Sequence, residues 1–412
     1  MRIRKGTFSF KEIFAFALPT ATILTQWLSV FGVSISWLLY IAVFALLLFR
    51  HHKLLRHVGI MLISAAVVIL PFANYLLGIA TVFPFSLYFS LITGMSMFLF
   101  ICSMDSREYS AFMKGVLFSC VLFTVWGIYE IFTGNYLFFS NEALLVKNWM
   151  GLNYPGVAFA NTNDLVQYLV LLFPCVSHFL LKSSKFIYAV SFAAVIFVIF
   201  HANTKLGMIA FCLIPLLAYI TDMAFQKNAR SIIRLLLIAA GVIVVLIIVD
   251  LTTGIVSSIF KGFMVVDSDA DYYVGRSQIY SDLIKFGLTH PLGGFGSAYS
   301  AAEMVPHNLF LYILCDFGWL AAIIFITLLF STIAYTLQRA KAGGEDKMFW
   351  LLLFASLCMF AFTSSISSCN EQRKAVWMFL AICIRNIFVS PVDGSEPLRS
   401  KKFKLVWSEH TR

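Results

Sequence analysis

The chain has 412 residues, of which 60% are hydrophobic and only 12% are charged, and its mean hydropathy is +0.88. A water-soluble protein of this composition would expose a very large apolar surface, so that class is excluded. Continuous apolar runs of about 20 residues also exclude a membrane β-barrel, whose strands alternate between apolar and polar positions. The sequence therefore predicts an all-α, polytopic integral membrane protein.

Twelve apolar stretches are expected to cross the membrane. In chain order they are residues 12–28, 31–49, 58–76, 82–102, 113–133, 164–181, 187–201, 204–221, 233–251, 307–335, 348–366 and 375–390. Most approach the length that a hydrocarbon core of about 30 Å requires. A polar, basic segment follows at residues 391–412. We therefore expect a transmembrane domain over residues 1–390 and a cytoplasmic tail over residues 391–412.

The formal net charge is +10, and its distribution predicts the orientation in the membrane. When Lys and Arg residues are assigned to alternating sides of the twelve spans, 23 of the 30 fall on the side of the two termini. The other seven are Lys147, Lys205, Lys261, Arg276, Lys285, Arg373 and Lys374. The positive-inside rule then places both termini in the cytoplasm and these seven residues outside. The basic balance is thus a topology signal, and we expect no nucleic-acid partner.

Two segments on the outer side are longer than ordinary connectors. The first, residues 134–163, ends in Phe159-Ala160-Asn161-Thr162-Asn163, and the second, residues 252–306, is the longest polar break in the chain. Long loops in compact proteins are more often functional than idle. The second segment is therefore predicted to be a large extracytoplasmic loop that carries chemistry.

Within this large outer loop, apolar residues recur at helical spacing. They are Ile279, Tyr280, Leu283, Ile284 and Leu288. The spacing predicts a short amphipathic helix along the outer membrane surface, with Arg276 in its first turn and Gly287 as its stop. A helix that simply covers the top of the bundle is an equally good interpretation.

His307 and Asn308 open the next apolar run, directly after the large loop. A neutral imidazole near the interface can accept a proton from a hydroxyl in a transfer reaction, although a histidine here could also just cap the helix. Asp316 lies nine residues further along the same helix, about 13 Å deeper. An acidic group at that depth is a candidate functional residue, and a structural partner for a neighbouring helix is the alternative.

The outer cations Arg276, Lys205, Arg373 and Lys374 are candidates for binding an anionic substrate. An Arg side chain presents a planar fork that matches diphosphate oxygens, and Lys acts as a point charge. Snorkelling to the interface is the alternative for each of them. Asp267, Asp269 and Asp271 form an acidic run without the other ligands of a Ca²⁺ loop, so we expect no metal site there.

Four short patterns occur in an order that resembles the O-antigen ligase and polymerase superfamily. The first is the F-x-N-x-N element at Phe159 to Asn163, and the second is Asn203-Thr204-Lys205-Leu206-Gly207, where Lys205 replaces the usual Arg. The third is Arg276 followed by His290-Pro291-Leu292-Gly293-Gly294-Phe295-Gly296. Arg276 also forms an R-x10-G element with Gly287, which follows it after ten intervening residues. The fourth, an H-x10-G pattern, joins His307 to Gly318.

The resemblance implies a GT-C-like glycosyltransferase of the bacterial cytoplasmic membrane that uses an undecaprenyl-diphosphate-linked oligosaccharide and needs no cofactor. By position, Arg276 and Lys205 would bind the departing diphosphate and His307 would activate the acceptor hydroxyl. The further candidates for binding the diphosphate or the glycan are Asn161, Asn163, Asn308 and Arg373. The partners expected are the lipid-linked glycan, membrane lipid and a chain-length regulator protein.

Several activities fit this pattern. The R-x10-G element favours a polymerase that joins repeat units into capsule, exopolysaccharide or O-antigen, and the H-x10-G pattern fits a ligase equally well. A flippase for the same lipid-linked sugars should show short loops and several charges in mid-span, whereas the span interiors here look nearly uncharged apart from Asp316. A peptidoglycan polymerase would need an acidic catalytic residue in the large loop, and the His307 pattern argues against it.

Overall fold

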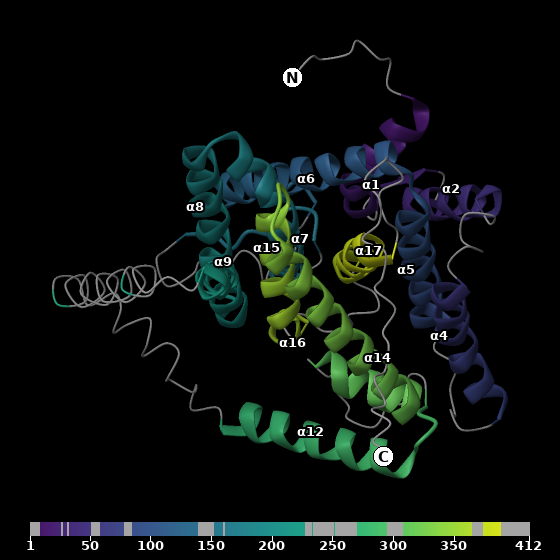
Figure 1. Ribbon diagram of the computed structural model, residues 1–412. Helices are drawn as coiled ribbons and strands as arrows, with labels where there is room; N and C mark the ends of the chain where they lie inside the picture. Colours follow the sequence, from purple (N-terminus) through teal and green to yellow (C-terminus); the bar gives the residue numbers. More distant parts are fainter. Residues whose placement is uncertain are drawn as a thin grey trace, which may run out of the picture.

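A computed structural model of the protein describes residues 9–25, 28–30, 33–50, 58–77, 85–138, 152–159, 161–226, 233, 251, 270–294, 308–364 and 374–388. The regular elements of these residues are helices, apart from the two-residue strands β1 (Ser29–Val30) and β2 (Val33–Ser34), which pair antiparallel. The all-α prediction is therefore confirmed. The helices are α1 (Phe10–Leu24), α2 (Ile35–Phe49), α4 (Val58–Leu76), α5 (Phe85–Ser103), α6 (Ser106–Thr133), α7 (Thr162–Ser183), α8 (Lys185–His201), α9 (Lys205–Gln226), α12 (Ala270–Thr289), α14 (Leu309–Ala342), α15 (Lys347–Cys358), α16 (Phe360–Thr363) and α17 (Lys374–Phe388) (Figure 1).

Helices occupy eleven of the twelve stretches expected to cross the membrane. The remaining stretch, residues 233–251, lies outside the described residues except at its two ends. Among the described helices, four are long and apolar enough to cross a membrane: α6, α7, α14 and the Leu206–Gln226 part of α9. Five others are apolar but shorter. The protein is thus an integral membrane protein, and the number of twelve crossings stays a prediction.

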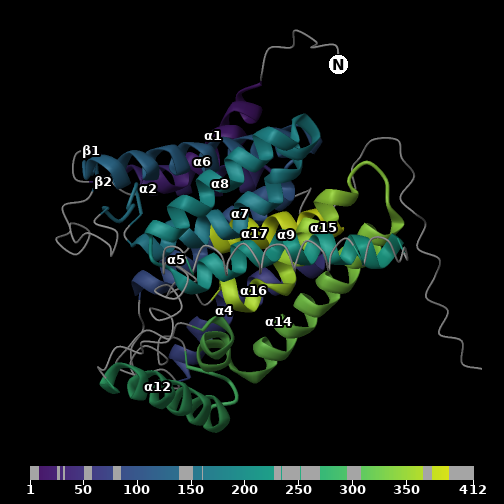
Figure 2. The same cartoon turned by 90° about the vertical axis from the view of Figure 1, so that its left-hand side faces the viewer.

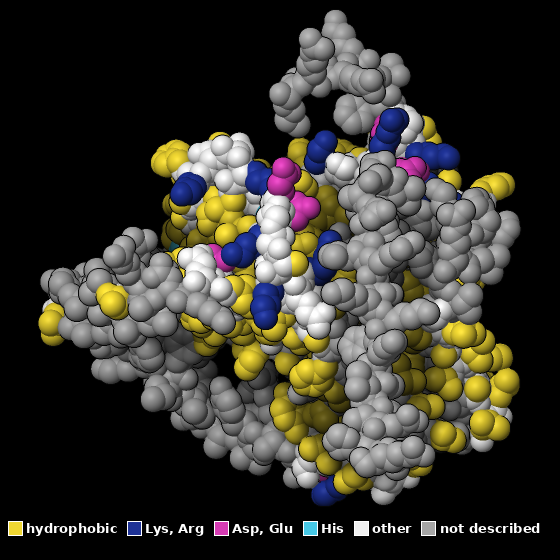
Figure 3. Space-filling model, viewed as in Figure 1, with side chains coloured by type: hydrophobic (Ala, Val, Ile, Leu, Met, Phe, Trp, Pro, Cys, Tyr) yellow, Lys and Arg dark blue, Asp and Glu magenta, His cyan; other side chains and the backbone are white. Residues whose placement is uncertain are grey.

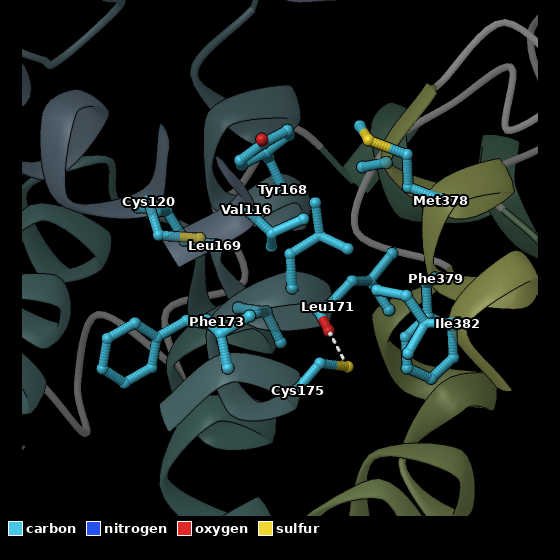
Figure 4. Packing of buried hydrophobic residues seen from close by; sticks show 14 of the residues in the cluster. Val116, Cys120, Tyr168, Leu169, Leu171, Phe173, Cys175, Met378, Phe379 and Ile382 are labelled. Atoms are coloured by element: carbon cyan, nitrogen blue, oxygen red, sulfur yellow. Dashed lines mark hydrogen bonds between the residues drawn. The ribbon is translucent and has the colours of Figure 1, made fainter. Parts of the chain in front are cut away.

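Helix α7 forms the centre of the core. It packs against α6, α8, α9, α15 and α17, and its side chains from Asp164 to His178 are buried without interruption. Figure 4 shows α7 side chains meeting Val116 and Cys120 of α6 on one side and Phe379 of α17 on the other. Because α7 begins directly after Asn161, the F-x-N-x-N element lies at one end of this buried helix.

Two regions lie at opposite ends of the molecule in both ribbon views. The layer formed by α1 and α6 lies at the top, α12 lies at the bottom, and α14 runs from α12 towards α15 (Figures 1 and 2). The charged side chains visible in Figure 3 gather mainly in the upper half, and yellow apolar side chains dominate below. Ion pairs join Lys182 to Asp346 and Lys347 to Asp222, so they tie α7 and α9 to the start of α15.

Helix α14 is broken at Gly318, which has φ 81° and ψ −179°. The rings of Phe310 and Phe325 lie 5.8 Å apart, although a continuous helix would separate these residues by about 22 Å. The two halves, residues 309–317 and 319–342, are therefore joined by a sharp bend. The second half alone is about 36 Å long, enough to cross a hydrocarbon core.

Candidate functional site

The first two family-like patterns touch each other. The hydroxyl of Thr204 donates a hydrogen bond to Oδ1 of Asn163 over 2.7 Å, and Thr204 itself is buried. Asn163 lies in the first turn of α7, and Lys205 is the first residue of α9. The contact therefore holds the start of α9, and with it the backbone of Lys205, against the start of the central helix.

Asn161 and Phe159 have structural roles at the start of α7. Oδ1 of Asn161 accepts a hydrogen bond from the backbone N–H of Asn163 over 2.8 Å, which caps α7. The ring of Phe159 is buried against Phe123 and Tyr168, with ring centroids 5.4 Å and 5.5 Å away. The F-x-N-x-N element therefore anchors and begins a helix. Binding of substrate by Asn161 stays a prediction.

The segment before this element is bound to the end of α6 by a buried carboxylate that the sequence analysis missed. Oε2 of Glu130 accepts hydrogen bonds from the backbone N–H groups of Gly156 and Val157 over 2.7 Å and 2.6 Å, and Glu130 is fully buried. The interpretation that the span interiors are nearly uncharged apart from Asp316 was therefore wrong. Glu130 lies inside the predicted span 113–133, and an acidic residue there was a signal that the sequence already contained.

The third and fourth patterns form one docked unit of α12 on α14. The amide of Trp319 and its indole Nε1 donate hydrogen bonds to the carbonyl oxygens of Pro291 and Gly287, over 2.9 Å and 2.7 Å. The amide of Gly294 donates a hydrogen bond to the carbonyl oxygen of Cys315 over 2.7 Å. A Cβ added at Gly287 would lie 2.8 Å from Leu314 Cγ, so the glycine allows the two helices to approach closely.

Two further motif glycines meet at the bend of α14. A Cβ on Gly318 would lie 2.3 Å from the carbonyl oxygen of Pro291, and a Cβ on Gly293 would lie 2.5 Å from the amide nitrogen of Gly318. Both residues have positive φ, 81° and 74°. Glycine is required at each position, because any other residue would combine a steric clash with a left-handed backbone. Gly318 of the H-x10-G pattern and Gly293 of the His290 to Gly296 stretch thus hold the turn after α12 on the broken helix.

Two expectations for the helix in the large loop need correction. It begins at Ala270, so Arg276 lies in its second turn, and it ends at Thr289 rather than at Gly287. Of its apolar residues, Leu283 packs against α14, whereas Ile284 and Leu288 are exposed. The apolar spacing located the helix, but docking on α14 selected the side that is buried.

Asp316 lies just before the bend of α14. The first half of α14 runs from Leu309, which packs in the main core, to Cys315, which packs against α12. Asp316 is fully buried beside Gly318. It therefore lies next to the turn that follows α12, and its depth in the membrane stays a prediction. Asn308 is at the other end, where its Oδ1 caps α14 by accepting from the amides of Phe310 and Leu311.

The predicted cationic and acid–base residues are described only in part. The backbones of Arg276 and Lys205 lie in α12 and α9, but their side chains are outside the described part of the chain. His307 and Arg373 lie wholly outside it. The convergence of these residues stays a prediction. Lys374 is described, and it is buried between helices: its Nζ donates to Thr93 Oγ1 over 2.8 Å and to the Ser90 carbonyl over 3.2 Å.

A comparison with known families covers three of the four patterns. Residues 190–326 match the family model described as O-antigen ligase. This part of the chain is similar to the O-antigen ligase family. The match covers Lys205, Arg276 and both ends of the H-x10-G pattern, and it confirms the resemblance to the O-antigen ligase and polymerase superfamily. No curated protein matches the chain. In the described structure, the matched region includes α9, α12 and the bend of α14.

Proposed function

We propose that this protein polymerises undecaprenyl-diphosphate-linked oligosaccharide repeat units into a surface polysaccharide on the outer face of the cytoplasmic membrane. The match of residues 190–326 to the O-antigen ligase family is the observation that carries the proposal. Two features support it. The patterns that would contribute Lys205 and Arg276 are built into buried contacts, namely the Thr204 to Asn163 hydrogen bond and the Gly293 to Gly318 contact.

In the proposed reaction, a hydroxyl oxygen of the acceptor sugar attacks the anomeric carbon of the donor. The bond between that carbon and the diphosphate oxygen breaks, and the lipid diphosphate leaves with the electron pair. His307 accepts the proton of the attacking hydroxyl, and Arg276 and Lys205 stabilise the charge that develops on the diphosphate. The diphosphate is a good leaving group, so the transfer needs no further energy source.

A ligase is the second candidate, because the matching family is described as O-antigen ligase. Such an enzyme would use the same donor and transfer the finished glycan to a lipid or cell-wall acceptor. The chemistry at the donor is identical in both cases. The two candidates therefore differ only in the acceptor that carries the attacking hydroxyl.

A gel of surface polysaccharide tests both candidates. A deletion strain is complemented with wild type, His307→Ala or Arg276→Ala at matched protein levels. The proposal predicts a ladder with wild type and single repeat units with the empty strain and both variants. Long chains that accumulate on the lipid carrier in the deletion strain would instead identify a ligase. Ladders in both variants would refute the assigned roles of His307 and Arg276.

A further inference from the structure

We propose that Glu130 is a positioning residue of the transfer site: its carboxylate sets the affinity for the lipid-linked donor by fixing the loop that leads into α7. The inference rests on the proposed function. It starts from an unusual placement, since a fully buried acidic side chain at the end of a membrane helix is costly unless it is bound by strong hydrogen-bond donors.

The donors are two successive backbone amides. Gly156 and Val157 both donate to the same oxygen, Oε2 of Glu130, over 2.7 Å and 2.6 Å. Both distances lie at or below the short end of the usual range for N–H···O hydrogen bonds. Val157 has φ 55°, a left-handed conformation that a β-branched residue adopts only when its surroundings hold it there. Glu130 supplies that constraint.

The constraint is passed on along a short path of described contacts. Two residues after Val157, Phe159 is locked between Phe123 and Tyr168. Asn163 then meets Thr204, the residue before Lys205. Glu130, at the end of α6, is therefore linked through these contacts to the first turn of α7 and the start of α9.

Other contacts hold the same loop, but they bind a different part of it. The side chain of Asn153 donates to the carbonyl of Ile131 over 3.1 Å, and the hydroxyl of Tyr136 donates to the carbonyl of Tyr154 over 2.7 Å. These contacts secure the loop before Gly156. Among the described residues, Glu130 is the side chain that receives the amides next to the left-handed turn, so its loss should loosen the site without unfolding the bundle.

The test measures donor transfer by the full-length protein in membranes. The probe is the lipid-linked glycan fraction extracted from the deletion strain, used as donor over a range of concentrations. Glu130→Gln keeps an oxygen acceptor of the same reach, whereas Glu130→Asp withdraws it by one methylene group. Tyr129→Phe is the matched control, since it removes a polar atom from an exposed residue in the same helical turn.

We expect Glu130→Asp to raise the KM for the donor about tenfold, with a much smaller change in kcat, because misplaced donor-binding groups weaken binding. Glu130→Gln should recover at least part of the lost affinity, and Tyr129→Phe should behave as wild type. A purely structural role would lower the active fraction, and so kcat, while leaving KM unchanged.

Either of two results would overturn the inference: an unchanged KM in Glu130→Asp at a wild-type melting temperature, or a fall in kcat alone. Both leave the proposed function intact as long as the wild-type protein transfers the donor. Failure of the wild type itself to use this donor would instead refute the proposed function. If Glu130→Asp does not accumulate in the membrane, the same comparison of KM values is made with Glu130→Gln. A lowered kcat at an unchanged KM in Glu130→Gln would count against positioning.

Discussion

Gly293 and Gly318 contact each other through their backbones, although they belong to different elements, the turn after α12 and the bend of α14. Either residue would bring a side chain to within 2.5 Å of a backbone atom if it were not glycine. This contact fixes the turn after α12 on the bend of α14. Helix α12, which carries Arg276, is thereby attached to the helix that starts after Asn308.

Gly318→Ala should therefore cost stability and activity together. The added methyl group meets the Pro291 carbonyl, and the positive φ combined with a ψ of −179° adds about 1–3 kcal/mol of strain. Gly343→Ala is a matched control, because Gly343 has φ 77° and nothing within 4 Å of the added Cβ. We expect the melting temperature of Gly318→Ala to fall well below that of Gly343→Ala. Equal melting temperatures would show that strain alone, and not the docked contact, matters at Gly318.

The Thr204 to Asn163 hydrogen bond can be measured with a double-mutant cycle. Thr204→Val and Asn163→Ala should each destabilise the purified protein by about 1 kcal/mol, with a coupling energy of about 0.5–1.5 kcal/mol. Thr332→Val serves as the control, since the hydroxyl of Thr332 donates only within its own helix, to Leu328. Additive effects of the two substitutions in thermal unfolding would mean that this contact contributes nothing.

Arg276 and Lys205 are expected to respond differently to exchange of one cation for the other. If Arg276 binds the diphosphate through both arms of its guanidinium, Arg276→Lys should lower kcat/KM for the donor about ten- to a hundredfold. Lys205→Arg should retain activity, because the superfamily pattern usually has Arg at this position. Donor transfer assays on membranes with matched protein levels measure both. Full activity of Arg276→Lys would reduce the role of Arg276 to that of a simple positive charge.

The buried ion pair between Arg50 and Glu108 should support the fold and not the chemistry. The guanidinium contacts both carboxylate oxygens, over 2.9 Å and 2.7 Å, and both side chains are almost fully buried. Arg50→Ala leaves the Glu108 charge buried without this partner, which should cost about 3–5 kcal/mol in the free energy of unfolding. Arg107→Ala, at an exposed neighbour of Glu108, should cost almost nothing. Equal loss of stability in the two variants would contradict this assignment.

Most helix positions could be predicted from the sequence, because a membrane helix must satisfy its backbone hydrogen bonds within itself and needs a long apolar run. Residues 58–76 are an example, since the predicted stretch and α4 have the same bounds. The superfamily was also recognisable, since its patterns lie within short segments. Asn161 and Asn308 were less predictable. An asparagine before a helix fits a substrate-binding role and a capping role equally well. The structure shows that both residues cap their helices.

The sequence by itself thus determined the membrane class, the positions of the helices and the superfamily, because all three depend on local composition and spacing. Only the tertiary structure decided that α14 bends at Gly318, that α12 buries Leu283 and leaves Ile284 exposed, and that Glu130 holds the loop before α7. These features depend on contacts between residues far apart in the chain. A glycine or a glutamate in an apolar run has the same local pattern whichever partner it meets, so packing alone assigns its role.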